Sequence, residues 1–217
     1  MDRRTFLEST VVLAAAAAVP GLALAKDQTA VLPPPSMTGG KPLYEALAQR
    51  RTERAFAPEA LSAQTLSNVL WAAFGINRPS DGRRTAPSAK NWQEIDIYAA
   101  TADGLYLYEP KEHRLRLILD KDIRALAGKQ DFVATAPLNL IYVVDTSRSD
   151  TSGSADSTLL SWADTGFIGQ NVYLACAAEG LATVIRANID KPALAAAMKL
   201  TDKQFITLSQ TVGKPKA

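Results

Sequence analysis

Cysteine and histidine are almost absent from this chain, which holds one of each among 217 residues. A single cysteine excludes a disulfide within the chain, and one cysteine with one histidine cannot build the four-ligand sites typical of structural zinc. A Ser-His-Asp triad would have to use His113, which lies in the charged stretch PKEHRLR and is expected to be a solvated turn residue. Cys176 lies among small residues, so we expect a packed and inert thiol.

Several motifs of nucleotide and metal chemistry are missing as well. There is no glycine-rich phosphate loop with its lysine, no GxGxxG after a strand and no HExxH, so neither an ordinary nucleotide-binding domain nor a zinc protease is predicted. The formal net charge is only +2, which argues against a nucleic-acid-binding protein. Beyond the N-terminal region no run of about 18 apolar residues occurs, which excludes a protein with several transmembrane helices.

The N-terminal region has the composition of an export signal. A basic start with Arg3 and Arg4 precedes an alanine-rich apolar segment, and small residues at Ala23 and Ala25 suit cleavage. The arginine pair, followed by phenylalanine and leucine, resembles a twin-arginine signal. We therefore expect residues 1–25 to be removed on export and the mature protein to be periplasmic, with an uncleaved membrane anchor as the alternative.

The remaining chain divides into an arm and one domain. Residues 26–40 are rich in proline, glycine and polar residues and are predicted to form a linker or N-terminal arm. The domain at 41–217 is expected to be α+β, because helices and hairpins are interspersed along it. Helices are predicted from residue 41, over LSAQTLSNVLWAAFG, over 157–179 and over DKPALAAAMKL.

Strands are predicted between these helices. Residues 94–119 alternate between apolar and polar side chains and are expected to form an antiparallel meander with a hairpin turn at Asp103-Gly104. The continuous apolar run 138–144 predicts a central strand, and LATVI and FITLSQTV predict two more. Ser62 is a predicted N-cap, and Gly75 and Gly180 are expected to end helices, Gly75 in a left-handed conformation.

The stretch RRTERAF, residues 50–56, places Arg50, Arg51 and Arg54 within five positions. The chain otherwise offers basic residues, backbone amides and flat apolar surface, which suit a cofactor that brings its own reactivity. FMN is such a cofactor: its phosphate is well held by guanidinium groups, and its ring gains negative charge on reduction. Without further information, solvated charges at a helix end explain the arginines equally well.

Four segments in a fixed order make the chain similar to the nitroreductase family of FMN-dependent enzymes. They are RRTERAF with LSAQTLSNVLWAAFGINRP, then RRTAPSAKNWQEIDIYAA with DGLYLYEPKEHRL, then DTGFIGQNVYLACAAEGLATVI, and finally TVGKP. The resemblance extends from about residue 43 to 214. It implies an α+β fold with a central, mainly antiparallel sheet flanked by helices, and a homodimer in which the long helix at 157–179 packs against its copy.

The resemblance also implies which residues hold the phosphate side of FMN. Arg50, Arg51 and Thr52 would bind the phosphate and the ribityl chain. Lys214 would reach the phosphate from the C-terminus. Arg54 would lie over the pyrimidine edge of the ring, where its charge stabilises the reduced flavin.

Two further segments would meet the ring itself. PSAKN matches the family's Pro-Ser-x-x-Asn loop, so Pro87, Ser88 and Asn91 would contact the flavin from the partner subunit. A short backbone segment after Gly180 would pass flavin N5; it consists of Ile185, Arg186, Ala187 and Asn188. No catalytic side chain and no metal ion are implied, because the flavin carries the chemistry.

The function implied by the resemblance is an FMN-dependent oxidoreductase that transfers hydride or electrons through flavin N5. Its substrate would be small and flat, such as a nitroaromatic or a quinone. NAD(P)H is scarce outside the cytoplasm, so an exported enzyme is expected to use a non-nicotinamide electron donor. Two alternatives stay open: a flavin dehydrogenase like those that oxidise peptide azolines, whose RR(S/T)xRxF pattern the chain also resembles, and a relative that binds flavin or another flat ligand without turnover.

Overall fold

A seven-stranded antiparallel sheet forms the centre of the protein, whose computed structural model describes residues 29–149 and 154–216. The strand order is β1-β6-β5-β4-β7-β9-β8, and each neighbouring pair is antiparallel. The α+β fold with a central, mainly antiparallel sheet is thereby confirmed. The export signal predicted at residues 1–25 lies outside the described residues. The strands are β1 (Thr29–Val31), β4 (Ile95–Thr101), β5 (Gly104–Glu109), β6 (Arg114–Leu119), β7 (Leu138–Asp145), β8 (Ala182–Arg186) and β9 (Gln204–Gly213).

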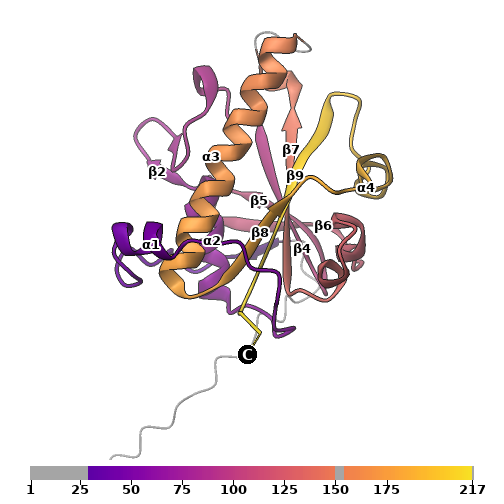
Figure 1. Cartoon of the computed structure of the whole chain (residues 1–217). Coiled ribbons are helices and arrows are strands. Elements are labelled where there is room, and N and C mark those ends of the chain that lie inside the picture. The colour runs from indigo at the N-terminus through magenta and orange to yellow at the C-terminus, as the bar shows by residue number, and fades with distance from the viewer. Residues whose placement is uncertain (1–28, 150–153, 217) are drawn as a thin grey trace, which may run out of the picture.

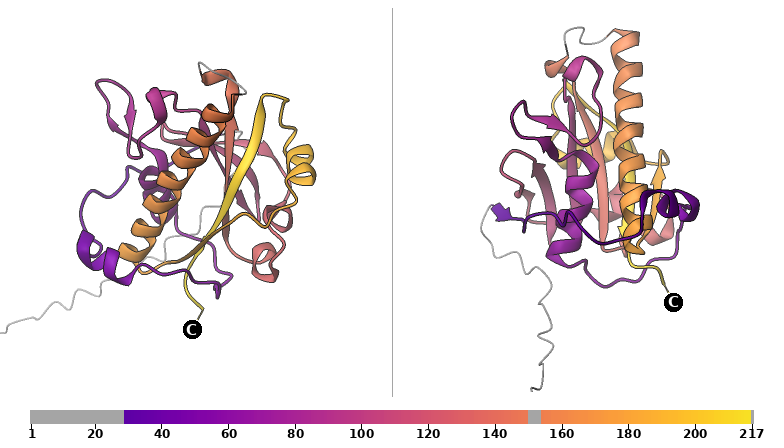
Figure 2. Two further views of the ribbon diagram at one scale, coloured as in Figure 1. Left: turned by 45° about the horizontal axis from the view of Figure 1, so that its top comes forward. Right: turned by 90° about the vertical axis from the view of Figure 1, so that its left-hand side faces the viewer.

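Helices cover both faces of this sheet (Figure 1). The α-helices are α1 (Leu43–Gln49), α2 (Ala63–Phe74), α3 (Ala155–Glu179) and α4 (Lys191–Met198). Short 3-10 helices are η1 (Ala89–Asn91), η2 (Arg124–Ala127), η3 (Asp131–Ala134) and η4 (Thr146–Arg148), and β2 (Ile76–Arg78) pairs with β3 (Arg83–Arg84) in a separate ribbon. Helices α2 and α3 lie side by side on one face, as Figure 2 shows, whereas η2, η3 and α4 pack on the other. No helix in the described part of the chain is long and apolar enough to cross a membrane.

The predicted central strand is β7, which is buried on both of its faces. Leu140 and Tyr142 point into the core under α2 and α3, and Ile141 and Val143 point into the core under α4. A strand with two covered faces requires a continuous apolar run, since successive side chains alternate between the faces. The predicted meander is also confirmed, because β4, β5 and β6 are neighbours and the hairpin closes where Thr101 pairs with Gly104.

The residues predicted to cap α2 and α3 lie at the ends of these helices, and one predicted conformation is wrong. The Ser62 side chain accepts a hydrogen bond from the Thr65 amide at the start of α2, and Gly180 ends α3 at a φ of 72°. Gly75 ends α2, but the left-handed conformation predicted for it is wrong, because its φ is −68°. A Cβ at Gly75 would lie 2.4 Å from Trp71 Cδ1, so glycine is required there for space and not for its conformation.

The prediction that His113 is a solvated turn residue is wrong. Its ring is half-buried, with Nε2 2.7 Å from Ser67 Oγ and Nδ1 2.9 Å from Tyr108 Oη. Nε2 also lies 3.1 Å from the Pro33 carbonyl oxygen, and the amide of the buried Leu32 donates to the His113 carbonyl. The histidine therefore fastens the N-terminal arm, whose strand β1 pairs with the edge strand β6.

Two glycine-to-alanine variants separate conformational strain from steric overlap. Gly180 has open space around it, so Gly180→Ala adds only the strain of a side chain at φ 72°, and we expect a loss of about 1 kcal/mol of unfolding free energy. At Gly104 a Cβ would also lie 2.5 Å from the Leu119 carbonyl oxygen, so we expect a loss of at least about 2 kcal/mol. Chemical denaturation measures both values, and equal losses would contradict this explanation.

Candidate functional site

The arginine-rich segment runs from the end of α1 along the beginning of β8. The Glu53 amide donates to the Thr183 carbonyl over 3.0 Å, which fixes the segment to the sheet. The Arg50 guanidinium carbon lies 5.3 Å from the centre of the Tyr173 ring, within the range of a cation–π contact. Thr52 Oγ1 lies 3.0 Å from the hydroxyl of the same tyrosine. The structure thus attaches two of the predicted phosphate-side residues to one aromatic side chain of α3.

Tyr173 is the residue that joins the two halves of the predicted site. Besides meeting Thr52, its hydroxyl accepts a hydrogen bond of 3.1 Å from the Ile185 amide. The arginine segment and the end of β8 are therefore held on a common oxygen atom. Sequence reasoning missed Tyr173, although a tyrosine within the apolar run NVYLACAA is a signal that a buried polar tip requires a partner.

A basic cleft of about 440 Å³ opens beside Arg50 and Arg51. Lys41 also lines it, and the only carboxylate among its lining residues is that of Glu53, which pairs with Arg51. The C-terminal segment passes the same region: Pro215 lines the cleft, and the amide of Ala57 donates to the Lys214 carbonyl over 2.9 Å. The cleft carries a surplus of positive charge, which suits an anionic group such as a phosphate. Its lining residues are Lys41, Ala48, Gln49, Arg50, Arg51, Glu53, Ala177, Gly180, Leu181 and Pro215.

Arg54 and Lys214 complete the basic set on the surface. Both side chains are exposed, and among the described residues neither forms an ion pair. The charge of Arg54 is consequently free to meet a ligand.

The segment after β8 offers free backbone donors. The amides of Ala187 and Asn188 have no hydrogen-bond partner in residues 29–149 and 154–216, and both residues are exposed. The Asn188 carbonyl accepts from the Lys129 amide over 3.1 Å, which holds the segment in place. Since the Ile185 amide is already bonded to Tyr173, the free donors of this segment are the amides two and three residues further along the chain.

The side chain of Arg186 points away from this segment. Its guanidinium group is buried on the opposite face of the sheet, where it donates to Thr211, to Asn139 Oδ1 over 2.8 Å and to the Ala127 carbonyl over 3.2 Å. Burial lowers the pKa of Arg186 to about 10. Of Arg186, only the backbone can therefore contribute to a site on the α3 side.

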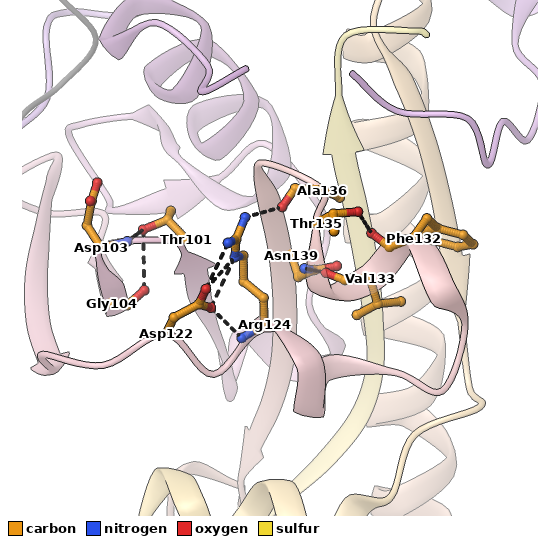
Figure 3. A network of polar contacts seen from close by, with 10 residues as sticks. All are labelled: Thr101, Asp103, Gly104, Asp122, Arg124, Phe132, Val133, Thr135, Ala136 and Asn139. Carbon is orange, nitrogen blue, oxygen red and sulfur yellow. Dashed lines mark hydrogen bonds and ion pairs between the residues drawn. The ribbon is translucent and has the colours of Figure 1, made fainter. Parts of the chain in front are cut away.

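Figure 3 shows the polar contacts of Arg124 and Asn139 in the neighbouring loops. Arg124 forms an ion pair of 2.8 Å with Asp122 and donates to the Ala136 carbonyl over 2.9 Å. The Asn139 amide group donates to the Val133 carbonyl over 2.9 Å. These contacts hold η2 and η3 against the sheet, which keeps the polar network around Arg186 away from water.

One flank of α3 faces the segment after β8. Trp162, Gly166, Gly169 and Tyr173 follow at spacings of four, three and four, which places them in one stripe of the helix. A Cβ at Gly169 would lie 2.5 Å from the Ile185 side chain, whereas a Cβ at Gly166 would meet nothing within 4 Å. Open space therefore lies over Gly166, next to the level where the free amides occur.

The PSAKN loop is folded inward at Ser88. The Ser88 hydroxyl accepts from the Gln93 amide over 2.8 Å and donates to Glu94 Oε2 over 3.2 Å. Its side chain is thus occupied within the loop, and only the Ser88 backbone remains for a ligand. Pro87 and Asn91 are exposed, as a contact with a ligand or a partner requires.

The structure does not bring this loop to the arginine segment of the same chain. The loop is attached to α3 through the Ala89 amide, which donates to Asp164 Oδ2 over 2.8 Å, whereas the arginine segment is attached through Tyr173. Nine residues separate Asp164 from Tyr173, which corresponds to a rotation of about 180° and a rise of about 14 Å. The two attachments lie on opposite flanks of α3, so one ligand cannot meet both within a single chain.

Comparisons with known proteins identify the family of the chain. The sequence model of the nitroreductase family matches residues 47–214. The chain belongs to the nitroreductase family. It is therefore an oxidoreductase, and the sequence resemblance is confirmed at the level of the family.

Individual members of the nitroreductase family match over most of their length. A solved structure from Ralstonia eutropha, described as a nitroreductase, is 38% identical, with 88% of this chain and 91% of that chain covered and a TM-score of 0.84. A protein of Methanocaldococcus jannaschii, also described as a nitroreductase, is 33% identical over 152 residues, which are 65% of this chain and 76% of the relative. A solved family protein from Desulfovibrio desulfuricans in complex with FMN is 21% identical, with 82% of this chain and 88% of that chain covered and a TM-score of 0.60, and shares the fold.

The role of Tyr173 is tested by removing its hydroxyl group. Tyr173→Phe leaves the ring in place but deprives the Ile185 amide and Thr52 of their common partner, so we expect a loss of about 1–2 kcal/mol of unfolding free energy. Ser80→Ala is the control, because it also removes a hydroxyl group, but one that is exposed and has no hydrogen-bond partner among the described residues. Chemical denaturation of both variants is the measurement. Equal stability of Tyr173→Phe and the control would refute the bridging role.

Proposed function

We propose that this protein is an FMN-dependent oxidoreductase whose substrate is a small flat molecule such as a nitroaromatic or a quinone. The observation that carries the proposal is the connection, through Tyr173, between a basic cleft and a backbone segment with free amides. An anion-binding end and a hydrogen-bonding end on one rigid frame suit a long molecule with a phosphate at one end and a planar ring at the other.

The basic cleft fits the phosphate of FMN. Arg50, Arg51 and Lys41 supply fixed positive charges around it, and Thr52 adds a hydroxyl for the ribityl chain. Lys214 approaches from the C-terminal segment. Charge-assisted hydrogen bonds of this kind contribute about 1.5–3 kcal/mol each.

The segment after β8 fits the ring edge of a flavin. An exposed amide of Ala187 or Asn188 is free to donate to N5, and the open space over Gly166 leaves room for a planar group. Arg54 would add positive charge beside the pyrimidine, where the ring becomes more negative on reduction. A bound flavin supplies the electron transfer at N5, and the chain binds the cofactor, orients it and tunes its charge.

The side chains of the described residues support this division of labour. Burial raises the pKa of Cys176, whose thiol lies fully inside the core, so it is unsuited to act as a nucleophile. The only histidine is engaged in holding the N-terminal arm. Neither residue is available for covalent catalysis, so the redox step falls to the cofactor.

The proposal includes a homodimer, because the PSAKN loop and the arginine segment of one chain lie on opposite flanks of α3. In a dimer built around α3, the loop of each chain can serve the cleft of the other. Large apolar side chains are exposed on the two helices that such an interface would use: Leu43, Tyr44 and Leu47 on α1, and Leu159, Leu160 and Phe167 on α3. Their burial between two chains would stabilise the assembly.

We also propose that the protein is exported and receives electrons from a donor other than a free nicotinamide. The proposal rests on the N-terminal sequence with Arg3 and Arg4. Fusing residues 1–25 to a reporter that is active only after export tests it, and we expect activity that Arg3→Lys with Arg4→Lys abolishes. Retention of the reporter in the cytoplasm would remove the basis for a non-nicotinamide donor.

FMN affinity tests the cofactor proposal. Arg50→Ala removes a guanidinium from the cleft and should weaken FMN binding by about 10- to 100-fold, measured by titration of flavin fluorescence. Arg83→Ala is the matched control, because Arg83 is exposed, pairs with Asp81 and does not line the cleft. Equal affinity of the two variants for FMN would contradict the assignment of the cleft to the phosphate.

A further inference from the structure

The PSAKN loop has an unusual backbone. Lys90, Asn91 and Gln93 have φ values of 48°, 58° and 51°, so three non-glycine residues out of four adopt the left-handed region. Each such residue is strained, and a run of them persists only where the surrounding structure holds it. The loop therefore requires an anchor that outweighs its strain.

Two buried carboxyl groups supply this anchor. Glu94 Oε2 accepts from the Ser88 hydroxyl over 3.2 Å, and Asp164 Oδ2 accepts from the Ala89 amide over 2.8 Å. Ser88 in turn accepts from the Gln93 amide, which closes the loop. The two residues that precede the strained stretch are thus held by one carboxyl group from Glu94, just before β4, and one from Asp164 on α3.

The carboxyl pair is buried without a cation. Glu94 is 0% exposed and Asp164 3% exposed, and among the described residues neither forms an ion pair. Glu94 Oε1 is buried without a hydrogen-bond partner. A buried carboxylate without a neutralising cation is costly to ionise, so burial raises the pKa of Asp164 and favours its protonated form.

The charged groups around the pair are already engaged elsewhere. From η4, Arg148 pairs with Asp96 over 2.8 Å and with Asp145, and it donates to the backbone carbonyls of Gln93 and Glu94 and not to their side chains. From η1, the Lys90 ammonium lies 5.2 Å from the centre of the Trp92 ring. Neither cation neutralises the carboxyl pair.

We propose that Glu94 and Asp164 are positioning residues: their buried carboxyl groups form a clamp, through Ser88 and the Ala89 amide, that holds the strained loop in the shape that meets the flavin of the partner subunit. This inference rests on the proposed function for its flavin contact. The clamp itself does not depend on it, because the hydrogen bonds and the backbone strain lie within one chain.

The clamp makes loop anchoring depend on pH. Burial, followed by the neighbouring charge of Glu94, raises the pKa of Asp164 to about 6 from its usual 3.8. A raised pKa means that the stabilisation is complete below about pH 4 and is lost as the pH rises through about 6. Above that pH, the ionised Asp164 carboxylate lies buried beneath the loop without a cation that neutralises it, which works against the strained shape of the loop.

The test uses Asp164→Asn, which keeps an oxygen for the Ala89 amide and adds an N–H group toward Glu94. In the flavin-free protein, we expect the urea midpoint of the wild type to fall between about pH 4 and pH 6 and that of Asp164→Asn to fall clearly less, as measured by chemical denaturation. Asp81→Asn, at an exposed carboxylate paired with Arg83, is the control and should follow the wild type. The same slope in Asp164→Asn and the wild type would overturn the clamp.

A separate measurement, the pH dependence of FMN affinity, tests the contact between the loop and the flavin. Relative to Asp164→Asn, the wild type should lose FMN affinity as the pH rises above 6, by several-fold and at most about tenfold per pH unit; taking the ratio of the two affinities removes the contribution of the FMN phosphate, which ionises in both proteins. Glu94→Gln provides the second variant and should also flatten the profile. If the wild-type protein binds FMN at no pH, the proposed function fails while the denaturation slopes still decide the clamp. If FMN binds and all variants share one pH profile, the contact between loop and flavin is refuted.

Discussion

The hydroxyl group of Tyr173 is the contact on which the arrangement of the site depends. It joins Thr52 of the arginine segment to the Ile185 amide at the end of β8, and the tyrosine ring lies beside Arg50. These segments are separated by more than 100 residues of sequence, yet one oxygen atom bonds to both, next to the backbone bond from Glu53 to Thr183. The Tyr173 side chain of α3 thus helps to combine the basic cleft and the two free amides into one site.

The helix that unites these segments also separates them from the PSAKN loop. Asp164 holds the loop on one flank of α3, and Tyr173 holds the arginines on the other. A rigid helix cannot present both flanks to one ligand, which is why we propose that a complete site is built from two chains. The clamp formed by Glu94 and Asp164 fits this proposal. A loop that contacts the ligand of another subunit is not held by the cleft of its own chain, so contacts within the loop must keep its shape.

The elements that the sequence predicted well are those whose signal is local. The run LNLIYVV, the Asp103-Gly104 turn and the cap at Gly180 each determine their structure within a few residues. The basic segment and the PSAKN loop were recognisable from the family pattern. Contacts between distant segments could not be predicted in this way. His113 contacts Ser67 and Pro33. The Arg186 side chain points to the face of the sheet opposite α3, and the Ser88 side chain points into its own loop. The direction of a side chain at such a position depends on which distant segments the fold brings next to it. A local sequence pattern does not contain that information.

The central claim is that the chain forms a two-subunit frame for FMN in which the flavin performs the redox chemistry. The most direct measurement is the visible absorption spectrum of the purified, assembled protein during titration with FMN. The account predicts saturable binding of two flavins per dimer, with a shift of the flavin bands and quenched fluorescence. A colourless dimer that leaves the spectrum and fluorescence of added FMN unchanged would contradict it.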